Sequence, residues 1–150
     1  MATIAHSKDD LSPDSLMALI RRVRGFCELK EADIRNRTGL TEAQYSFLRV
    51  MPIGGPLRTG ELCRLGGLSP SRGGRVIDEM VREGFLSRVE DPEDRRIQTL
   101  NLAQKGLAAR RQILALITRC DEILWERLSA PDLEKVLGGL KALASVIEER

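Results

Sequence analysis

The fold is decided by residues 59–85, which read TGELCRLGGLSPSRGGRVIDEMVREGF. The glycine pair 66–67 predicts the end of one short helix, and Ser69 followed by Pro70 predicts the start of another, which ends before Gly84. The second helix has an inward apolar face made of Val76, Ile77, Met80 and Val81. Two helices joined by a short glycine turn are typical of a helix-turn-helix unit.

A β-hairpin is predicted directly after this helix pair. Residues 85–89 read as a short strand, 90–96 as a polar turn that contains Pro92, and 97–102 as a second strand. We therefore expect a mainly α fold with a small β-hairpin, which is a winged helix-turn-helix.

Long helices are predicted on both sides of this unit. Apolar residues spaced by three, four and seven draw one stripe from Leu16 to a stop at Gly39, and Thr41 with Gln44 forms a capping-box pattern that starts a second helix. A broader apolar surface follows the hairpin, on a helix that we expect to be covered on two sides, and the chain restarts near Pro131 into a last helix.

A monomer of 150 residues would struggle to cover apolar stripes at both chain ends. We therefore expect one domain over residues 1–150, in which 11–38 and 103–150 are dimerisation helices and 40–102 form a DNA-binding lobe. The lobe assignment depends on the charge pattern described next.

The composition excludes several classes of protein. Hydrophobic residues make up 42% and charged residues 31% of the chain, which fits a folded globular protein. The chain has neither a signal-peptide core nor an apolar run of about 20 residues, so we expect a cytoplasmic protein without a membrane partner. The single histidine, His6, and the absence of HExxH, GxxxxGK[ST] and GxSxG motifs argue against an enzyme. Neither a cofactor nor a metal is expected.

Local charge, rather than the net charge of +2, points to DNA. The stretch from Arg64 to Arg75 contains three arginines and no acidic residue. The second helix of a helix-turn-helix can place its first residues against base edges in the major groove, where the planar fork of arginine suits guanine. The candidate DNA-binding residues on this helix are Ser69, Ser71, Arg72 and Arg75.

Residues 40–106 resemble the MarR family of winged helix-turn-helix regulators. The most specific piece is DPEDRR at 91–96, followed by Leu100, Leu102 and Gly106, which is similar to the wing signature DPxDRRxxxLxLxxxG. The resemblance implies a homodimer on a pseudo-palindromic double-stranded operator, with recognition helices in successive major grooves and wings in the flanking minor grooves. It also implies a repressor that a small-molecule effector releases. We assign no residues to the effector.

The resemblance also adds wing residues to the candidate site. It implies that Asp94 pairs with Arg96 and holds the wing, and that Arg95 and Arg96 contact the minor groove and phosphates. A carboxylate can fix a guanidinium in advance, and a narrow minor groove attracts arginine. The sequence departs from the family pattern at Arg58, in place of a helix-capping Ser or Thr, and at Gly73-Gly74, which should weaken the recognition helix.

Two alternatives stay open. A winged helix can bind another protein instead of DNA, because fold alone does not fix function. Alternatively, oxidation of a cysteine could switch the regulator. Cys27, Cys63 and Cys120 form neither a CxxC pattern nor a disulfide framework, and we expect all three to be small core residues. Because Cys27 lies on the apolar stripe of the first helix, we expect a buried, protonated thiol there.

Overall fold

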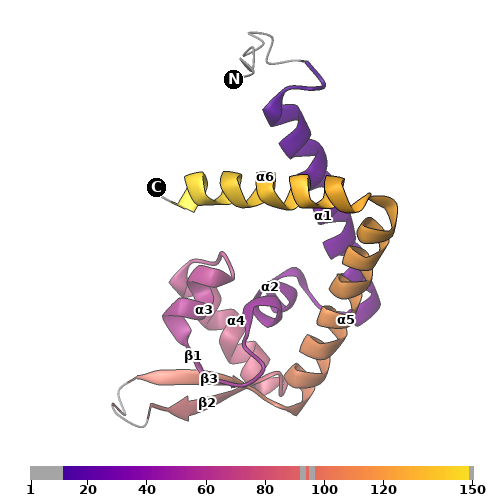
Figure 1. The fold of residues 1–150 in the computed structure, drawn as a ribbon. Coiled ribbons are helices and arrows are strands. Elements are labelled where there is room, and N and C mark those ends of the chain that lie inside the picture. The colour runs from indigo at the N-terminus through magenta and orange to yellow at the C-terminus, as the bar shows by residue number, and fades with distance from the viewer. Residues whose placement is uncertain (1–11, 92–93, 95–96, 149–150) are drawn as a thin grey trace.

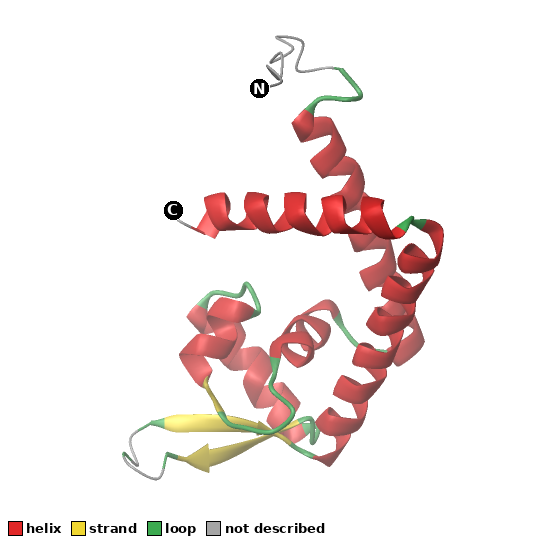
Figure 2. Ribbon diagram, in the orientation of Figure 1, coloured by secondary structure: helices red, strands yellow, loops and turns green. Residues whose placement is uncertain are grey.

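The computed structural model describes residues 12–91, 94 and 97–148. The elements in chain order are α1 (Leu16–Thr38), α2 (Glu42–Val50), β1 (Leu57–Arg58), α3 (Thr59–Leu65), α4 (Pro70–Arg82), β2 (Leu86–Glu90), β3 (Gln98–Leu102), α5 (Gln104–Arg127) and α6 (Ala130–Glu148). Figure 1 and Figure 2 show a lobe that contains α2, α3, α4 and the sheet, from which the long helices α1, α5 and α6 extend. The mainly helical fold with a small sheet confirms the predicted fold class.

The helix ends follow the capping signals in the sequence. Thr41 and Gln44 form both hydrogen bonds of the capping box at the start of α2, and Gly39 ends α1 in the left-handed conformation, with φ of 67°. Ser69 stands at the predicted N-cap of α4, but its side chain makes no capping hydrogen bond to the described backbone. Residues 69 and 70 therefore start the helix through backbone conformation and the fixed φ of Pro70.

The sheet has three antiparallel strands in the order β1-β3-β2. The predicted hairpin is β2 and β3, in which Leu86 pairs with Leu102, and the short β1 adds Leu57 opposite Leu100. The hairpin was predicted and β1 was not, because two residues show no alternation of polar and apolar positions.

The hydrophobic core lies inside the lobe and extends to the first turns of α5. Its fully buried large side chains are Phe47, Leu48, Met51, Leu62, Ile77, Met80, Leu86, Leu100 and Ile113. Ile113 belongs to α5, and so does Gly106, whose α-carbon lies so close to the residue before β2 that an added Cβ would meet the Phe85 carbonyl oxygen at 1.9 Å. The start of α5 is therefore packed as part of the lobe.

The long helices leave apolar side chains exposed in the single chain. None of the described residues of α6 is buried, and Ile34 is the one buried residue of α1. Helix α5 contacts α1 and α2, as expected of a helix covered on two sides, although Trp125 near its end is 57% exposed in this chain. The expectation that Cys27 is a core residue is wrong for this chain alone, since Cys27 is exposed. The apolar stripes are present as predicted, and α1 contacts α5, but many apolar side chains of the described long helices stay exposed in the single chain.

The described helices include none that is both long enough and apolar enough to cross a membrane.

Candidate nucleic-acid interface

Helices α3 and α4 pack closely because of a glycine. A Cβ added at Gly73 would lie 2.3 Å from the Cys63 Sγ atom and 3.3 Å from the Cys63 Cβ atom. Cys63 is buried, with 3% of its surface exposed, so there is little space into which the thiol could move. Gly73 thus allows the two helices to pack closely. Helix propensity, from which the sequence analysis predicted only a weaker helix, does not predict this role. Its neighbour Gly74 has no described atom within 4 Å of an added Cβ.

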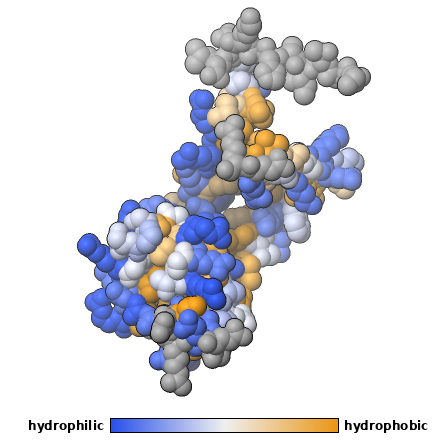
Figure 3. Space-filling model, turned by 90° about the vertical axis from the view of Figure 1, so that its left-hand side faces the viewer, coloured by the Kyte–Doolittle hydropathy of each residue, from blue (hydrophilic) through white to orange (hydrophobic). Residues whose placement is uncertain are grey.

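The predicted DNA-binding residues of α4 share one exposed face. Gly73, Ile77 and Met80 are the buried residues of α4. The residues on the exposed side at the start of the helix are Ser69, Ser71, Arg72 and Arg75. Figure 3 shows that hydrophilic residues dominate the visible face of the lobe, whereas apolar side chains are exposed on the long helices above it. All four side chains are therefore accessible at the start of α4.

Two side-chain contacts hold α4 against its neighbours. Asp78 accepts a hydrogen bond from the guanidinium of Arg88, which ties the helix to β2. Near the other end, Gln44 Nε2 donates to Glu83 Oε2 over 2.8 Å and ties α2 to the end of α4. The first contact joins α4 to the sheet, and the second joins its end to α2.

The wing is the connection between β2 and β3. At its base, the Asp91 amide donates to the Ile97 carbonyl over 3.0 Å, and the Ile97 amide donates to the Asp94 carbonyl over 2.9 Å. Thr99 Oγ1 adds a 2.9 Å hydrogen bond to the carbonyl of Val89. Asp94 is exposed, while Arg95 and Arg96 lie outside the described residues, so the pairing of Asp94 with Arg96 stays a prediction.

Sequence reasoning missed an ion pair between β1 and the wing base. The Arg58 guanidinium lies 3.9 Å from a carboxylate oxygen of Asp91, and the Asp91 side chain is only 16% exposed. Arg58 occupies the N-cap position of α3 without a capping hydrogen bond from its side chain to the described part of that helix. No local pattern could have predicted the pair, because 33 positions of sequence and the whole of α4 separate its members.

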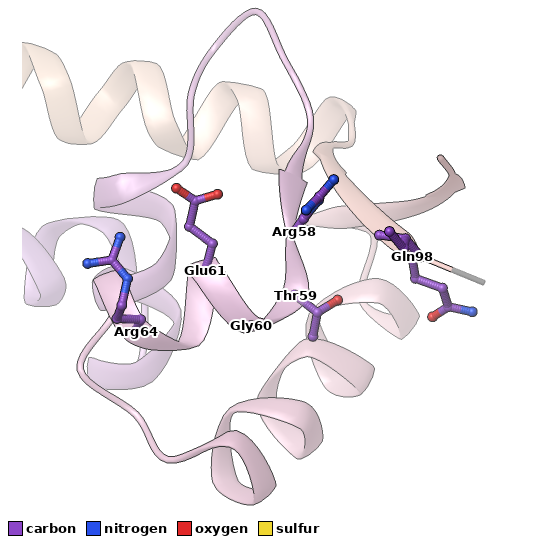
Figure 4. A pocket seen from close by; sticks show the side chains of 7 residues that line it. Arg58, Thr59, Gly60, Glu61, Arg64 and Gln98 are labelled. Carbon is purple, nitrogen blue, oxygen red and sulfur yellow. The ribbon is translucent and has the colours of Figure 1, made fainter. Parts of the chain in front are cut away.

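A cleft of about 870 Å³ lies where α3 begins, between that helix and β3. The side chains around it include Arg58, Thr59, Glu61, Arg64, Ile97 and Gln98. Figure 4 shows Arg58 and Gln98 on one side and Glu61 and Arg64 on the other. Of these, the charge pattern pointed to DNA only at Arg64, and Arg58 stood out only as a departure from the family's capping residue.

Two polar side chains, those of Tyr45 and Arg110, lie where the lobe meets the long helices. The buried Tyr45 of α2 has a raised pKa, first because burial disfavours the phenolate and then because the Glu31 carboxylate is near, against a smaller opposite effect of Arg49 and Arg35. Arg110 of α5 donates from Nε to the Met51 carbonyl over 3.1 Å, just beyond α2. This junction couples the lobe to α5 through a defined hydrogen bond.

The cysteines and acidic residues give no sign of a metal centre. Among the described residues, no group of three or more His, Cys, Asp or Glu side chains is placed to hold a metal ion. Burial raises the pKa of the Cys63 thiol, which disfavours the reactive thiolate. Cys120 is half-buried, and Cys27 is exposed.

A helix-turn-helix with exposed arginines on its second helix and a hairpin beside it defines a winged helix-turn-helix regulator of transcription. The family model described as "MarR family" matches residues 38–97. The uncharacterised HTH-type transcriptional regulator YsmB of Bacillus subtilis (strain 168) is 30% identical over 105 residues, which are 70% of each chain. The chain therefore belongs to the MarR family.

Solved structures show the same fold. The transcriptional repressor CouR, bound to a 23-mer DNA duplex, aligns with a TM-score of 0.68 and 24% identity over 86% of this chain and 92% of CouR. The PcaV regulator from Streptomyces coelicolor, in complex with its natural ligand, aligns with a TM-score of 0.62 and 24% identity over 87% of this chain and 92% of PcaV.

Proposed function

We propose that this chain represses transcription as a homodimer in the cytoplasm, and that a small-molecule effector releases it from a pseudo-palindromic operator. The observation that carries the proposal is the exposed set of serines and arginines at the start of α4, held beside the wing. CouR, a repressor bound to DNA, and PcaV, a regulator bound to its ligand, support the two partners by analogy of fold.

In the proposed complex, α4 is the recognition helix and enters the major groove. Arg72 and Arg75 carry the charge, and Arg75 is the candidate for a two-pronged contact with guanine O6 and N7. Ser69 and Ser71 supply hydroxyls for base edges or phosphates. The packing of Gly73 against Cys63 fixes the distance between α4 and α3, so the arginines have a defined starting position.

The wing is proposed to reach the adjacent minor groove. Arg95 and Arg96 are the inserted side chains, and Asp94 orients Arg96. These three roles follow from the family resemblance, and the described hydrogen bonds at Asp91 and Ile97 support an ordered wing base next to them.

The second copy of the chain is proposed to cover the long helices. Exposed apolar side chains include Leu16, Val23 and Leu29 of α1 and Val146 and Ile147 of α6. Such side chains are rarely left in water over several helix turns of a folded protein. The proposed division is therefore 11–38 and 103–150 for dimerisation and 40–102 for DNA, with a thermal midpoint that rises with protein concentration as its test.

A second candidate is release by thiol oxidation, favoured by one observation: Cys27 is exposed in the single chain. This thiol lies on the same stripe of α1 that we propose to be covered in the dimer. Peroxide added to the complex with DNA should leave binding unchanged if a ligand is the effector. Release by peroxide that Cys27→Ser abolishes would establish the redox alternative instead.

The proposal is tested by binding to genomic DNA fragments at several salt concentrations. Affinity should fall steeply as salt rises, because each neutralised phosphate releases counterions. Arg75→Ala should cost about 1 to 3 kcal/mol of binding free energy and relax base preference. Arg82→Ala is the matched control, an exposed arginine at the far end of the same helix. Binding that is absent for the parent, or flat with salt, would refute the proposal.

A further inference from the structure

The cleft between α3 and the wing has the composition of an anion site. Two of its side chains are guanidinium groups, those of Arg58 and Arg64, and Thr59 and Gln98 offer neutral donors. Among the described residues that line it, Glu61 is the acidic one, and the Asp91 carboxylate lies beside Arg58 without lining the cleft, so the two guanidinium groups are its exposed cationic groups. A guanidinium has five N–H donors in a fixed plane and binds phosphate oxygens through two of them at once.

Arg58 has a carboxylate beside it and keeps an exposed guanidinium. Asp91, mostly buried at the wing base, lies 3.9 Å from one terminal nitrogen of Arg58, while the Arg58 side chain stays 64% exposed. Since that side chain does not cap the described part of α3, its remaining donors are not used by the helix. Asp91 can therefore attract one end of the guanidinium electrostatically while most of the Arg58 side chain stays exposed.

The place of the cleft indicates which anion it meets. The helix that precedes the recognition helix borders it on one side, and β3 of the wing borders it on the other. When a recognition helix occupies a major groove and a wing occupies the next minor groove, the phosphate strand that separates the two grooves passes between them. The cleft is open at this point and is large enough for a phosphodiester group.

We propose that Arg58 and Arg64 bind backbone phosphodiester oxygens of the operator in this cleft, with Asp91 as the positioning residue of Arg58. The inference rests on the proposed function and adds to it a pair of contacts outside α4 and the wing tip. These contacts are independent of base sequence, so they set affinity and register rather than specificity. Glu61 opposes the phosphate and limits the strength of the site.

The test measures DNA affinity against salt for Arg58→Gln and Arg64→Gln, on the operator and on an unrelated duplex. Each substitution should reduce the slope of log K against log salt by about 1.8 and weaken binding at least about tenfold on both duplexes, because each subunit of the proposed homodimer loses one phosphate contact. Arg37→Gln is the matched control, an exposed arginine in the last turn of α1. It should keep the parent slope.

Asp91→Asn distinguishes a phosphate contact by Arg58 from a purely structural role of Arg58 at the wing base. If Arg58 touches the phosphate, Asp91→Asn keeps the parent slope and loses less affinity than Arg58→Gln, and Arg58→Lys restores the slope. If Arg58 acts only by holding the wing, Asp91→Asn and Arg58→Gln have equal effects and the double variant is no worse, which would overturn the inference. Parent slopes in both arginine variants would also overturn it. A parent that fails to bind DNA at all would refute the proposed function first.

Discussion

Gly73→Ala should destabilise the protein even though alanine is the better helix former. Alanine in place of glycine inside a helix is worth about 1 kcal/mol of folding free energy. At Gly73, however, the new methyl would lie 2.3 Å from the Cys63 Sγ atom and 3.5 Å from the Phe47 ring. Both of those side chains are buried, so α3 and α4 must separate by about 1 Å, and overpacking of this kind costs about 1 to 3 kcal/mol.

The net expectation is a loss of up to about 2 kcal/mol in the free energy of unfolding. Urea unfolding followed by circular dichroism measures it, at one fixed protein concentration because dimerisation would shift the midpoint. Gly74→Ala is the matched control on the next residue. It has no described atom within 4 Å of the added methyl and should stabilise the protein by about 0.5 to 1 kcal/mol.

The double variant Gly73→Ala with Cys63→Ala tests the cause directly. Removing the sulfur should relieve the clash, so the two substitutions should show a favourable coupling energy of about 1 kcal/mol in a double-mutant cycle. A Gly73→Ala protein as stable as Gly74→Ala, or a coupling energy near zero, would show that the close approach of the two helices is not what requires the glycine.

Three further results are expected. Gly106→Ala should destabilise the protein more than Gly73→Ala, because the added Cβ would meet a backbone carbonyl oxygen at 1.9 Å. Urea unfolding measures the loss of stability, and a midpoint equal to that of the parent would contradict the prediction. Alkylation should be slow at Cys63, where burial raises the pKa of the thiol, and fast at the exposed Cys27 in dilute protein. Mass spectrometry measures the two rates, and equal rates would contradict the burial of Cys63. The pKa of Asp132 is lowered, first by its hydrogen bond with Ser129, so its stabilisation of α6 is present above about pH 4 and is lost as pH falls through the lowered folded pKa. Asp132→Asn should remove that acid-side change in melting curves, and an unaltered curve would contradict it.

Signals that act within a few residues could be predicted from the sequence. The start of α2 at Thr41, the end of α1 at Gly39 and the order of helices and hairpin all follow from capping residues and apolar spacing. The exposed face that carries Arg72 and Arg75 follows from the same spacing, since the apolar residues of α4 occupy the opposite side.

Features that depend on distant parts of the chain could not be predicted. The Arg58–Asp91 pair joins β1 to the wing base, and the need for Gly73 comes from a thiol ten positions earlier on another helix. The exposure of Cys27 was predicted wrongly for a related reason: periodicity shows that a helix has an apolar face but does not show whether the same chain covers it.

The contacts near Arg110 join the start of α5 to the lobe, so a tilt of α5 would move the lobe with it. Its first turns are locked to the lobe by the contact of Gly106 with Phe85 and by the hydrogen bond from Arg110 to Met51, while its other end carries α6. A helix of 24 residues is about 36 Å long, so a tilt of about 10° displaces one end by about 6 Å relative to the other. Adjacent base pairs are about 3.4 Å apart. If α6 is anchored in a dimer, a small tilt of α5 is enough to displace each recognition helix by more than the separation of two adjacent base pairs.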